Sequence, residues 1–560
     1  MITVRRAGDA ALLLLLAFDG AAQDGNEAAR LAAAITAAAL PGVTDVVPGA
    51  ATVLVRFEPG ACEPAGLASQ LRQIGAGPLP DLSGRADDAI VIGVVYDGPD
   101  LAEVAALTGL TADEVISRHQ AADYRVGWLG FSPGFGYLTG LDPLLAAVPR
   151  LDSPRPSVPA GSVAIAGGLA AVYPAASPGG WRLLGHTDAV LWDPDRDPPA
   201  LLAPGRRVRF RAVRSSAAPV SATAAAPPAA TSGERLVQVL QPGPLTTVQD
   251  LGRAGLAHLG VPRSGAADQP SLRLANQLAG NDESAACLEI TLGRLALRFD
   301  TDAEVALAGA PVPIRLSPGG GDAADSAGRP PQYETAFAVP AGTVLRLGAP
   351  PAGLRSYLAI AGGIEVSPVL GSRSADLLSG LGPPPLQPGE WLRVGRPRSR
   401  PEKGEHRRQH AGVPAATRPA AGPGPPVLSG PAVLSGPAGP TGITVLRAIA
   451  GPRADWFEAA ALAALAAGSY QVSPVSNRTG LRLTGPPLRR ARAAELPSEG
   501  IAAGSLQVSH DGQPILLLAD HPTTGGYPVI AVLVSADLGL AAQLRPGQHV
   551  RFVVGSPPVL

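Results

Sequence analysis

A short β-type module is written three times along the chain, and it limits the possible folds more than any other feature. Each copy opens with Ala-Gly-Ser or Ala-Gly-Thr and continues into an alternating apolar stretch. It then reaches a Gly-Gly pair about twenty residues later and closes on Pro-Gly followed by a period-2 strand. From the opening to the closing glycine the copies span 44, 47 and 43 residues. Three elements repeated in one order at one spacing predict three related β modules. The copies open at Ala160, Ala341 and Ala503 and close at Gly205, Gly389 and Gly547.

Two stretches without hydrophobic periodicity divide the chain. Residues 215–234 are rich in Ala, Pro, Ser and Thr, and residues 396–441 are rich in Pro, Arg and Gly, which is typical of linkers. A chain of 560 residues is long enough for roughly three or four domains. The predicted fold class is mainly β with an α/β N-terminal domain. The predicted units are a small ferredoxin-like α/β domain at 1–85, β modules at 86–214, 235–395 and 442–560, a linker at 215–234 and a disordered linker at 396–441.

Charge and cysteine content exclude several classes of protein. The net charge is −1, so nothing indicates a nucleic-acid partner or an acidic membrane surface. The apolar run 12–16 is too short to span a bilayer and is better interpreted as a buried strand. Cys62 and Cys287 are the two cysteines, and their separation fits neither a metal motif nor a disulfide scaffold. We therefore expect a cytoplasmic protein.

Lysine is almost absent, which limits the ways in which this chain could bind phosphate or carry a cofactor. Lys403 is the single lysine among 45 Lys and Arg residues, and it lies in the predicted disordered linker. A P-loop, a kinase-type strand lysine and a biotin attachment site each need a lysine in a structured context. Any phosphate handled by this chain must therefore meet arginine side chains, backbone N–H groups or a metal.

An aromatic run marks the first module. Residues 124–138 contain five of the 22 aromatic residues, and their Gly and Pro spacing predicts a strand, a tight loop and a second strand. His119 lies five residues upstream of Tyr124. One interpretation is an aromatic-walled pocket with an acid/base group beside it. The other is a core histidine next to a packed aromatic corner, and spacing alone leaves both open.

The Gly-Gly pairs differ between copies. Hydroxyl and aromatic side chains flank the pairs at 177–181 and 523–527, whereas 361–364 lacks both. Glycine pairs let backbone N–H groups approach an anion closely, and a nearby Arg155 would add bidentate recognition. The alternative is a tight turn without a ligand. We expect the middle copy to be scaffold and the ligand to lie near the first and third copies.

Arginine and aspartate recur in turn-rich loops, where they are candidates for anion or metal binding. An isolated arginine is more often a solvated surface charge. The repeated occurrence of arginine in turn-rich loops is what indicates a binding role. The residues concerned are Asp250, Arg253, Arg263, Asp268, Arg373, Arg478 and Asp520. Glu289 also stands inside an apolar strand-like stretch, either on a surface face or in a site.

These stretches resemble the 5-oxoprolinase/urea amidolyase family. The N-terminal part, here called the B-like half (1–214), resembles the B subunit of the prokaryotic ATP-dependent 5-oxoprolinase. The C-terminal part, the C-like half (235–560), resembles the C subunit of the same enzyme. The B-like resemblance lies at 130–138, 154–155, 158–162 and 177–181, together with His119 and Tyr124. The C-like resemblance lies at 249–253, 260–268, 371–374, 498–500 and 523–528. Departures from the family pattern are modest: His186 where Arg is usual and Ala375 where Thr is common.

The resemblance implies cyclophilin-like β-barrels, one in the B-like half and two in the C-like half. It implies ATP-driven opening of 5-oxo-L-proline to L-glutamate, carried out with a separate protein that is similar to the enzyme's A subunit. ATP and Mg²⁺ are the expected cofactors, with no covalent biotin. The predicted catalytic residues are His119, Asp250, Asp268 and Asp520, and the three aspartates are also the candidate metal ligands. The predicted substrate- and phosphate-binding residues are Arg155, Ser177, Gly179, Gly180, Arg253, Arg263, Arg373, Arg478, Thr523, Thr524, Gly525 and Gly526.

Two other functions fit the same resemblance. The chain could be a carboxyltransferase-like partner in biotin-dependent urea or amide carboxylation, with biotin carried by another protein. It could instead be a non-enzymatic regulator of a sensor histidine kinase, although an inhibitor and its antagonist are expected to be separable rather than fused. An allophanate hydrolase needs an amidase Ser-Ser-Lys set, which the position of Lys403 excludes.

Overall fold

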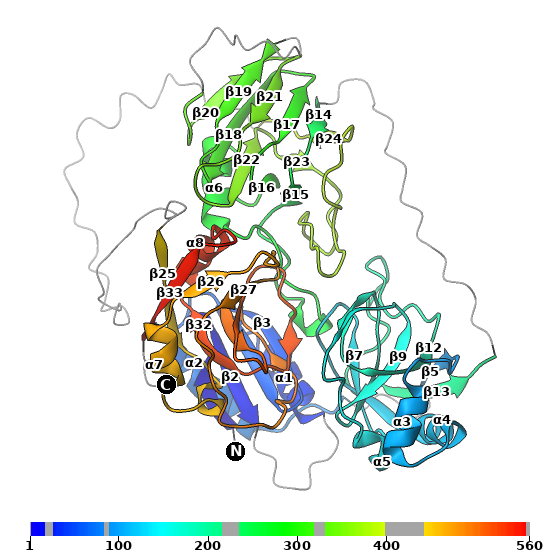
Figure 1. Ribbon diagram of the computed structural model, residues 1–560. Coiled ribbons are helices and arrows are strands. Elements are labelled where there is room, and N and C mark those ends of the chain that lie inside the picture. The colour runs from blue at the N-terminus through cyan, green and yellow to red at the C-terminus, as the bar shows by residue number, and fades with distance from the viewer. Residues whose placement is uncertain are drawn as a thin grey trace.

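The computed structural model describes residues 2–16, 26–82, 89–214, 235–318, 331–397 and 442–555. The predicted linker 215–234, and all but the first two residues of the one predicted at 396–441, lie outside the described residues. Figure 1 shows the N-terminal unit (blue) against the C-terminal barrel (orange to red), the first barrel (cyan) to one side and the middle unit (green) above them. Within the described ranges, no helix has the length and apolarity to cross a membrane.

The N-terminal unit is a four-stranded antiparallel sheet with two helices. Its elements are β1 (Ile2–Arg6), β2 (Ala11–Leu16), α1 (Glu27–Ala37), β3 (Val43–Pro48), β4 (Thr52–Phe57) and α2 (Pro64–Ala76). The apolar run 12–16 forms the interior strand β2, as predicted, in the sheet order β1-β2-β4-β3. This is a circularly permuted ferredoxin-like arrangement. The strand that normally comes last in the βαββαβ unit comes first in this chain. The sandwich therefore begins with a hairpin.

The first barrel is a seven-stranded sheet that is almost closed. Its elements are β5 (Ile90–Val94), α3 (Leu101–Thr108), α4 (Ala112–Ala121), β6 (Tyr124–Leu129), β7 (Gly136–Thr139), α5 (Pro143–Ala146), β8 (Arg155–Val158), β9 (Ser162–Ala166), β10 (Leu169–Val172), β11 (Ser177–Gly179), β12 (Arg182–His186) and β13 (Arg207–Ala212). The sheet order is β12-β9-β10-β7-β6-β13-β5, and a bridge between Val95 and His186 joins its two edges. The aromatic run forms strand, tight loop and strand, as predicted. Thr111 and Glu114 form a capping box at the start of α4.

The middle unit consists of two sheets that face each other across one apolar core. Its elements are β14 (Arg235–Gln241), β15 (Leu245–Gln249), η1 (Ala257–Leu259), α6 (Gln269–Leu278), β16 (Cys287–Thr291), β17 (Ala296–Phe299), β18 (Ala303–Gly309), β19 (Ile314–Ser317), β20 (Ala336–Val339), β21 (Val344–Leu347), β22 (Arg355–Ile360), β23 (Ile364–Glu365) and β24 (Trp391–Val394). The sheet orders are β19-β21-β17-β14-β24-β23 and β15-β16-β22-β18-β20, and α6 covers the second sheet.

The C-terminal unit is a closed seven-stranded barrel of order β25-β32-β29-β30-β27-β26-β33. Its elements are β25 (Ile443–Ala450), η3 (Ala454–Trp456), α7 (Ala461–Ala467), β26 (Tyr470–Val472), β27 (Gly480–Thr484), β28 (Glu499–Gly500), β29 (Ser505–Val508), β30 (Pro514–Leu517), β31 (Thr524–Gly525), β32 (Val529–Leu533), η4 (Ser535–Asp537), α8 (Leu538–Ala542) and β33 (His549–Gly555). We call it the third barrel. The predicted mainly-β fold class with barrel modules is thus confirmed.

The three written modules share their turns but not all of their pairing. The φ angles are +78°, +74° and +80° at the opening Gly161, Gly342 and Gly504, and +85° at the closing Gly205, Gly389 and Gly547. Glycine adopts this left-handed region without the penalty that a Cβ imposes, which explains why the module repeats it. The closing strands β13 and β33 run parallel to the first strand of their unit, whereas β24 runs antiparallel to β14. The two outer copies are therefore the more alike.

The N-terminal sandwich packs on the third barrel. Leu13, Val47 and Leu54 form one apolar cluster with Ala502 of the third barrel. The Asp9 carboxylate accepts hydrogen bonds from the backbone N–H and hydroxyl of Ser535. This packing brings strands β3 and β4 next to β28. It joins the N-terminal unit to the C-terminal barrel, which lie against each other in Figure 1.

Candidate functional site between the first and third barrels

An open cleft of about 290 Å³ lies where the first barrel meets the third barrel. The Gly-Gly loops of the two outer modules both line this cleft, as does the loop of the aromatic run. We call it the aromatic cleft. Its lining includes Phe131, Phe135, Tyr137, Arg150, Tyr173, Gly179, Gly180, Trp181, Arg490, Ser498, His510, Thr524, Gly525, Gly526 and Tyr527. The middle module's pair Gly362-Gly363 does not line it.

Packed rings give the cleft a firm aromatic wall. Trp128 stacks on Tyr137 with ring centroids 4.6 Å apart and an interplanar angle of 15°. Phe135 meets Tyr137, Tyr173 and Trp181 edge to face at 5.0, 5.2 and 5.8 Å. Such pairs favour fixed ring orientations beyond their apolar burial. The wall is therefore suited to the flat face of a small ring.

Hydroxyl groups join the two barrels at the base of the cleft. The Phe131 backbone N–H donates to Thr524 Oγ1 at 2.8 Å, and Ser498 Oγ donates to Tyr137 Oη at 3.2 Å. Burial raises the pKa of Tyr137 above its ordinary value, and hydrogen bonds with Ser498 and Thr524 offset this only in part. The phenol therefore stays protonated at neutral pH and remains a hydrogen-bonding group.

Two arginines bring positive charge to the cleft. Arg150 Nε lies 3.6 Å from Glu495 in a half-exposed pair, and its guanidinium has no closer carboxylate among the described residues. Arg490 lies 5.6 Å above the Tyr527 ring and donates from Nη2 to the Val508 carbonyl. Arg490 is therefore fixed by the protein, while Arg150 keeps donors for an anion.

The glycines of the two pairs differ in how much room a side chain would have at each position. A Cβ at Gly179 would lie 2.2 Å from the Tyr173 hydroxyl, and one at Gly526 would lie 3.2 Å from Arg150 Nη1. At Gly180 the nearest atoms would be 3.6 Å away, which is ordinary contact. Gly179 thus makes room for the aromatic wall, and Gly526 for Arg150.

Arg155, which was predicted to bind an anion, instead forms an ion pair inside the first barrel. Its Nη2 bonds the carboxylate of Asp100 at 2.6 Å, and Asp100 also accepts from the Leu183 N–H. Arg150, five residues earlier in the same stretch, is the arginine that enters the cleft. Ser177 is buried, and its hydroxyl has no hydrogen-bond partner among the described residues.

His119 lies in the core of the first barrel, away from the cleft, so the core interpretation is the correct one. It stacks on Phe210 at 4.6 Å and its Nδ1 is 2.8 Å from the Tyr96 hydroxyl. It is fully buried, and burial lowers its pKa to about 3. A histidine held neutral and out of reach of either cavity does not fit the predicted acid/base role.

Asp250 braces two loops of the C-like half. Its carboxylate accepts hydrogen bonds from the hydroxyls of Ser372 and Ser374 and from the N–H groups of Gly252 and Arg373. These donors more than offset the effect of burial, so its pKa lies below the ordinary value. The carboxylate is therefore saturated by the protein.

The arginines next to Asp250 complete the same brace. Arg253 is buried and donates to the carbonyls of Val369 and Ser374, and Arg373 Nε donates to the Val366 carbonyl. Loops 120 residues apart in sequence are held together in this way. Neither guanidinium lines the aromatic cleft, and the predicted role of Arg253 and Arg373 in binding phosphate or substrate stays a prediction.

Arg478, Asp520 and Glu289 form a buried charge network between the middle unit and the third barrel. Arg478 donates to Asp520 from Nε at 2.8 Å and from Nη2 at 2.9 Å, and its Nη1 bonds Glu289. Arg355 lies 3.4 Å from the same glutamate. Glu289, inside strand β16, therefore belongs to a unit interface. The network explains Arg478 and Asp520 as interface residues, in place of their predicted site roles.

Asp268 caps helix α6 and joins it to the third barrel. It accepts from the Ser271 N–H and hydroxyl and from Gln543 Nε2 at 2.7 Å. Burial raises its pKa. Thr523 is fully buried, and its hydroxyl lacks a hydrogen-bond partner in the described part of the chain.

The three aspartates proposed as metal ligands do not meet at one site. Asp250 and Asp520 are each saturated by their own donors, and Asp268 is a helix cap. Over the described ranges, no group of three or more His, Cys, Asp or Glu side chains is placed to hold a metal ion. A site that needs all three carboxylates together therefore does not fit, and the expected Mg²⁺ stays a prediction.

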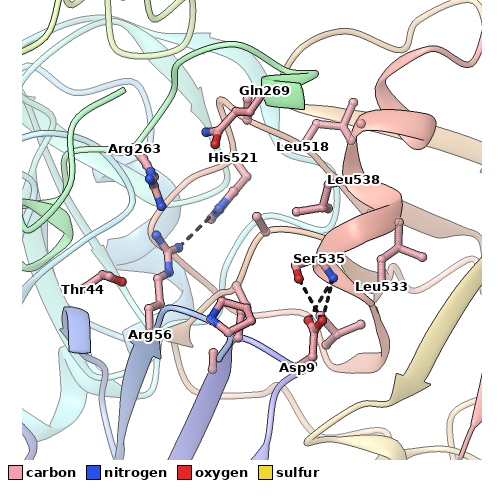
Figure 2. Close-up of a pocket in the computed structure, with 18 of the residues that line it drawn as sticks. Asp9, Thr44, Arg56, Arg263, Gln269, Leu518, His521, Leu533, Ser535 and Leu538 are labelled. Atoms are coloured by element: carbon pink, nitrogen blue, oxygen red, sulfur yellow. Dashed lines mark hydrogen bonds between the residues drawn. The ribbon is translucent and has the colours of Figure 1, made fainter. Parts of the chain in front are cut away.

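Of the predicted arginines, Arg263 is the one that lines either of the two cavities described among residues 2–555 with their gaps. The cavity that Arg263 lines, of about 430 Å³, lies between the N-terminal sandwich, segment 263–273 and the third barrel. Its other polar residues include Arg56 and His521 (Figure 2). Arg56 lies in strand β4, where the alternating pattern gave no sign of a functional role. Arg150 was within reach of the sequence analysis, because it stands five residues before the predicted ligand Arg155.

Family models place the chain among carboxyltransferase-type proteins. The model for subdomains A and B of the carboxyltransferase domain matches residues 259–554, and the model for subdomains C and D matches residues 2–202. The chain belongs to this family, together with the B and C subunits of 5-oxoprolinase.

Relatives of the chain match both of its halves. The C subunit of 5-oxoprolinase from Escherichia coli (strain K12) is 38% identical over 57% of this chain and 91% of its own length. The B subunit of 5-oxoprolinase from Bacillus subtilis (strain 168) is 36% identical over 37% of this chain and 91% of its length. Urea amidolyase of Lachancea kluyveri is 31% identical over 56% of this chain but only 17% of its own length. The crystal structure of TTHA0988 superimposes with a TM-score of 0.79 at 34% identity, covering 98% of this chain and 100% of that one.

Proposed function

We propose that the chain is the B–C component of an ATP-dependent 5-oxoprolinase. It would act on 5-oxo-L-proline together with a protein similar to the enzyme's A subunit, here called the A-like protein. The observation that carries the proposal is the aromatic cleft, to which both halves contribute: Tyr137 and Trp181 from the B-like half, Thr524 and Tyr527 from the C-like half. In the relatives these halves are the B and C subunits of 5-oxoprolinase. A cleft assembled from both would require both for binding.

The chemistry of the cleft suits a flat cyclic amide that carries a carboxylate. The ring of the substrate would lie against Tyr137 and Trp181, since ring faces favour offset stacking and exclude water. Its carboxylate would pair with Arg150, whose guanidinium keeps donors available. Protonated Tyr137 and the hydroxyls around it supply neutral hydrogen-bonding groups near the ring.

The reaction needs activation because an amide carbonyl is a poor electrophile. Transfer of a phosphoryl group from ATP to the lactam oxygen releases ADP and makes the ring carbon more electrophilic. Water then adds, the C–N bond breaks with a proton passing to the nitrogen, and a second water releases phosphate and L-glutamate. Enzymes assist such transfers by positioning and charge stabilisation. Mg²⁺ would accompany ATP, held by the phosphates together with one or two protein carboxylates.

The test is the release of glutamate and ADP from 5-oxo-L-proline and ATP, measured with and without the A-like protein. We expect turnover only with both proteins present. Arg150→Gln should raise the KM for 5-oxo-L-proline at least tenfold, because a charge-assisted hydrogen bond contributes about 1.5–3 kcal/mol. Arg211→Gln, at an exposed position on β13, is the control and should behave as wild type. Absence of 5-oxoproline-dependent ADP release with both proteins present would refute the proposal.

A second candidate is a carboxyltransferase-like role, favoured by the description of both family models. In that case the carboxyl group would come from carboxybiotin on another protein, because we expect no biotin on this chain. Transfer of labelled carboxylate from carboxybiotin to urea or an amide would support it.

A further inference from the structure

The cavity around Arg263, here called the arginine cavity, is built like an anion site and is separate from the aromatic cleft to which 5-oxo-L-proline is assigned. It lies where strand β4 of the N-terminal sandwich, the start of helix α6 and the loop after β30 come together. Figure 2 shows the Arg56 and Arg263 side chains close together on one side of the cavity, with His521 and Gln269 beside them. The opposite side carries Asp9, Ser535 and leucines of the third barrel (Figure 2).

Arg56 is held in position by acceptors from the third barrel. Its Nη2 donates to the Ile501 carbonyl at 2.5 Å and lies 3.3 Å from His521 Nε2. His521 Nδ1 is 2.7 Å from the Pro522 carbonyl, which can only accept, so Nδ1 carries the proton and Nε2 accepts from Arg56. The histidine therefore orients the guanidinium. The buried Nε of Arg56 has no hydrogen-bond partner among the described residues.

Arg263 is close to Arg56 and has donors to spare. None of the hydrogen bonds or ion pairs found over the described ranges involves its guanidinium, and its buried Nε is unpartnered there. Burial, and then the positive charge of Arg263, lower the pKa of Arg56 despite the opposing charge of Asp45. Two guanidinium groups with unused donors at short range repel each other unless an anion lies between them.

The acidic groups of the cavity do not supply that anion. Asp9 is bonded by the N–H and hydroxyl of Ser535, and Glu58 is exposed. His521 is kept neutral, since burial and the charge of Arg56 lower its pKa to about 3. A third arginine on the lining, Arg273, is already paired with Glu283 at 2.6 Å. Asp45 affects the pKa of Arg56 more strongly than Arg263 does, but it accepts from the Ala257 N–H and does not line the cavity. Arg263 forms none of the ion pairs found over the described ranges, so its positive charge is left for a ligand.

We propose that the arginine cavity binds a phosphate group, either as free phosphate or as the terminal phosphate of a nucleotide, held between Arg56 and Arg263. A dianion matches the two guanidinium charges, and the planar N–H forks suit phosphate oxygens. The amide of Gln269 adds a neutral donor at the same side. The cavity of about 430 Å³ has room for the group to which the phosphate is attached.

The test is the binding of inorganic phosphate to the full chain, without any partner, by calorimetry at fixed low ionic strength. We expect one phosphate per chain. Arg263→Gln should weaken binding at least tenfold and Arg263→Lys less, because lysine keeps the charge and loses the fork. The control Arg273→Gln removes a lining charge that is already paired, and it should stay within twofold of wild type. Unchanged binding in Arg263→Gln would overturn the proposal.

Competition separates the two sources of phosphate from a carboxylate ligand. Displacement of phosphate by ATP at lower concentration than phosphate itself would identify a nucleotide, whereas failure of ATP to compete would identify free phosphate. Equal displacement by acetate or 5-oxo-L-proline would contradict a phosphate site. Melting temperatures of the variants exclude a folding defect. The readout involves neither turnover nor the aromatic cleft, so this proposal and the proposed function can fail separately.

Discussion

Arg478 forms two hydrogen bonds with Asp520, from Nε at 2.8 Å and from Nη2 at 2.9 Å, inside an interface where both side chains are almost fully buried. The same guanidinium bonds Glu289 of the middle unit. One residue of the third barrel thus ties together a loop of its own barrel and a strand of the preceding unit. The segment that begins at Asp520 then supplies His521 to the arginine cavity and Thr524 to the aromatic cleft. The charge network therefore fixes the start of the segment that contributes residues to both cavities.

Arg478→Ala should destabilise the C-like half by about 3–5 kcal/mol, because it leaves two buried carboxylates without their shared cation. Urea unfolding followed by circular dichroism measures the change. Arg492→Ala is the control, since Arg492 is half exposed and lies 3.4 Å from Asp455. We expect a change of about 0.5 kcal/mol or less there. Equal effects of the two substitutions would show that the network is not a stabilising interface.

Buried histidines should make stability depend on mildly acidic pH. The folded-state pKa of His119 is about 3, against an ordinary value of about 6.5, because burial disfavours the charged form. Between these values the unfolded chain binds one proton more, so stability is full above about pH 6.5 and falls as the pH drops. Each pH unit in this window costs about 1.4 kcal/mol.

His119→Phe should reduce that slope by about 1.4 kcal/mol per pH unit. Phenylalanine keeps the stacking position against Phe210 and carries no titrating group. His521 has a similarly lowered pKa and stays in the variant, so part of the slope should remain. Urea unfolding at pH 4.5, 5.5 and 7 provides the comparison. Identical slopes in the two proteins would contradict the buried, neutral state of His119.

Adjacent glycines of the first Gly-Gly loop should differ in their tolerance to alanine. A Cβ at Gly179 would lie 2.2 Å from the Tyr173 hydroxyl and displace it, while the nearest atom at Gly180 would be 3.6 Å away. We expect Gly179→Ala to raise the Kd for 5-oxo-L-proline at least tenfold and Gly180→Ala to change it less than twofold. Titration calorimetry with 5-oxo-L-proline measures the Kd of both variants. If both alanines behaved alike, the shape of the aromatic wall would not govern binding.

Local patterns in the sequence were enough to predict the β modules, and they pointed to the stretches that meet at the aromatic cleft. The repeated turns at Gly161 and Gly205 need left-handed backbone, and this constraint leaves a visible mark at fixed spacing. The aromatic run and the hydroxyl-bearing Gly-Gly loops were expected near a ligand, and the structure brings residues of both, such as Tyr137 and Thr524, to one cleft. Sequence reasoning finds functional residues when they lie together in one short stretch of the chain.

The chemical roles of single charged residues could not be predicted in the same way. Asp250 looks the same in a sequence whether it faces a ligand or, as here, two hydroxyls and two N–H groups. Arg56 stands in a regular alternating strand, and its position in a cavity depends on the sandwich packing against the third barrel. That packing joins segments more than 400 residues apart, which no local pattern records.

The most direct measurement is the titration of the full chain with 5-oxo-L-proline, comparing wild type with Arg150→Gln and the exposed control Arg211→Gln. A carboxylate held by Arg150 against the aromatic wall predicts one binding site per chain. It also predicts a Kd at least tenfold higher in Arg150→Gln and unchanged in Arg211→Gln. Absence of binding by the wild-type chain, or equal affinity in Arg150→Gln, would contradict the assignment of the aromatic cleft to 5-oxo-L-proline.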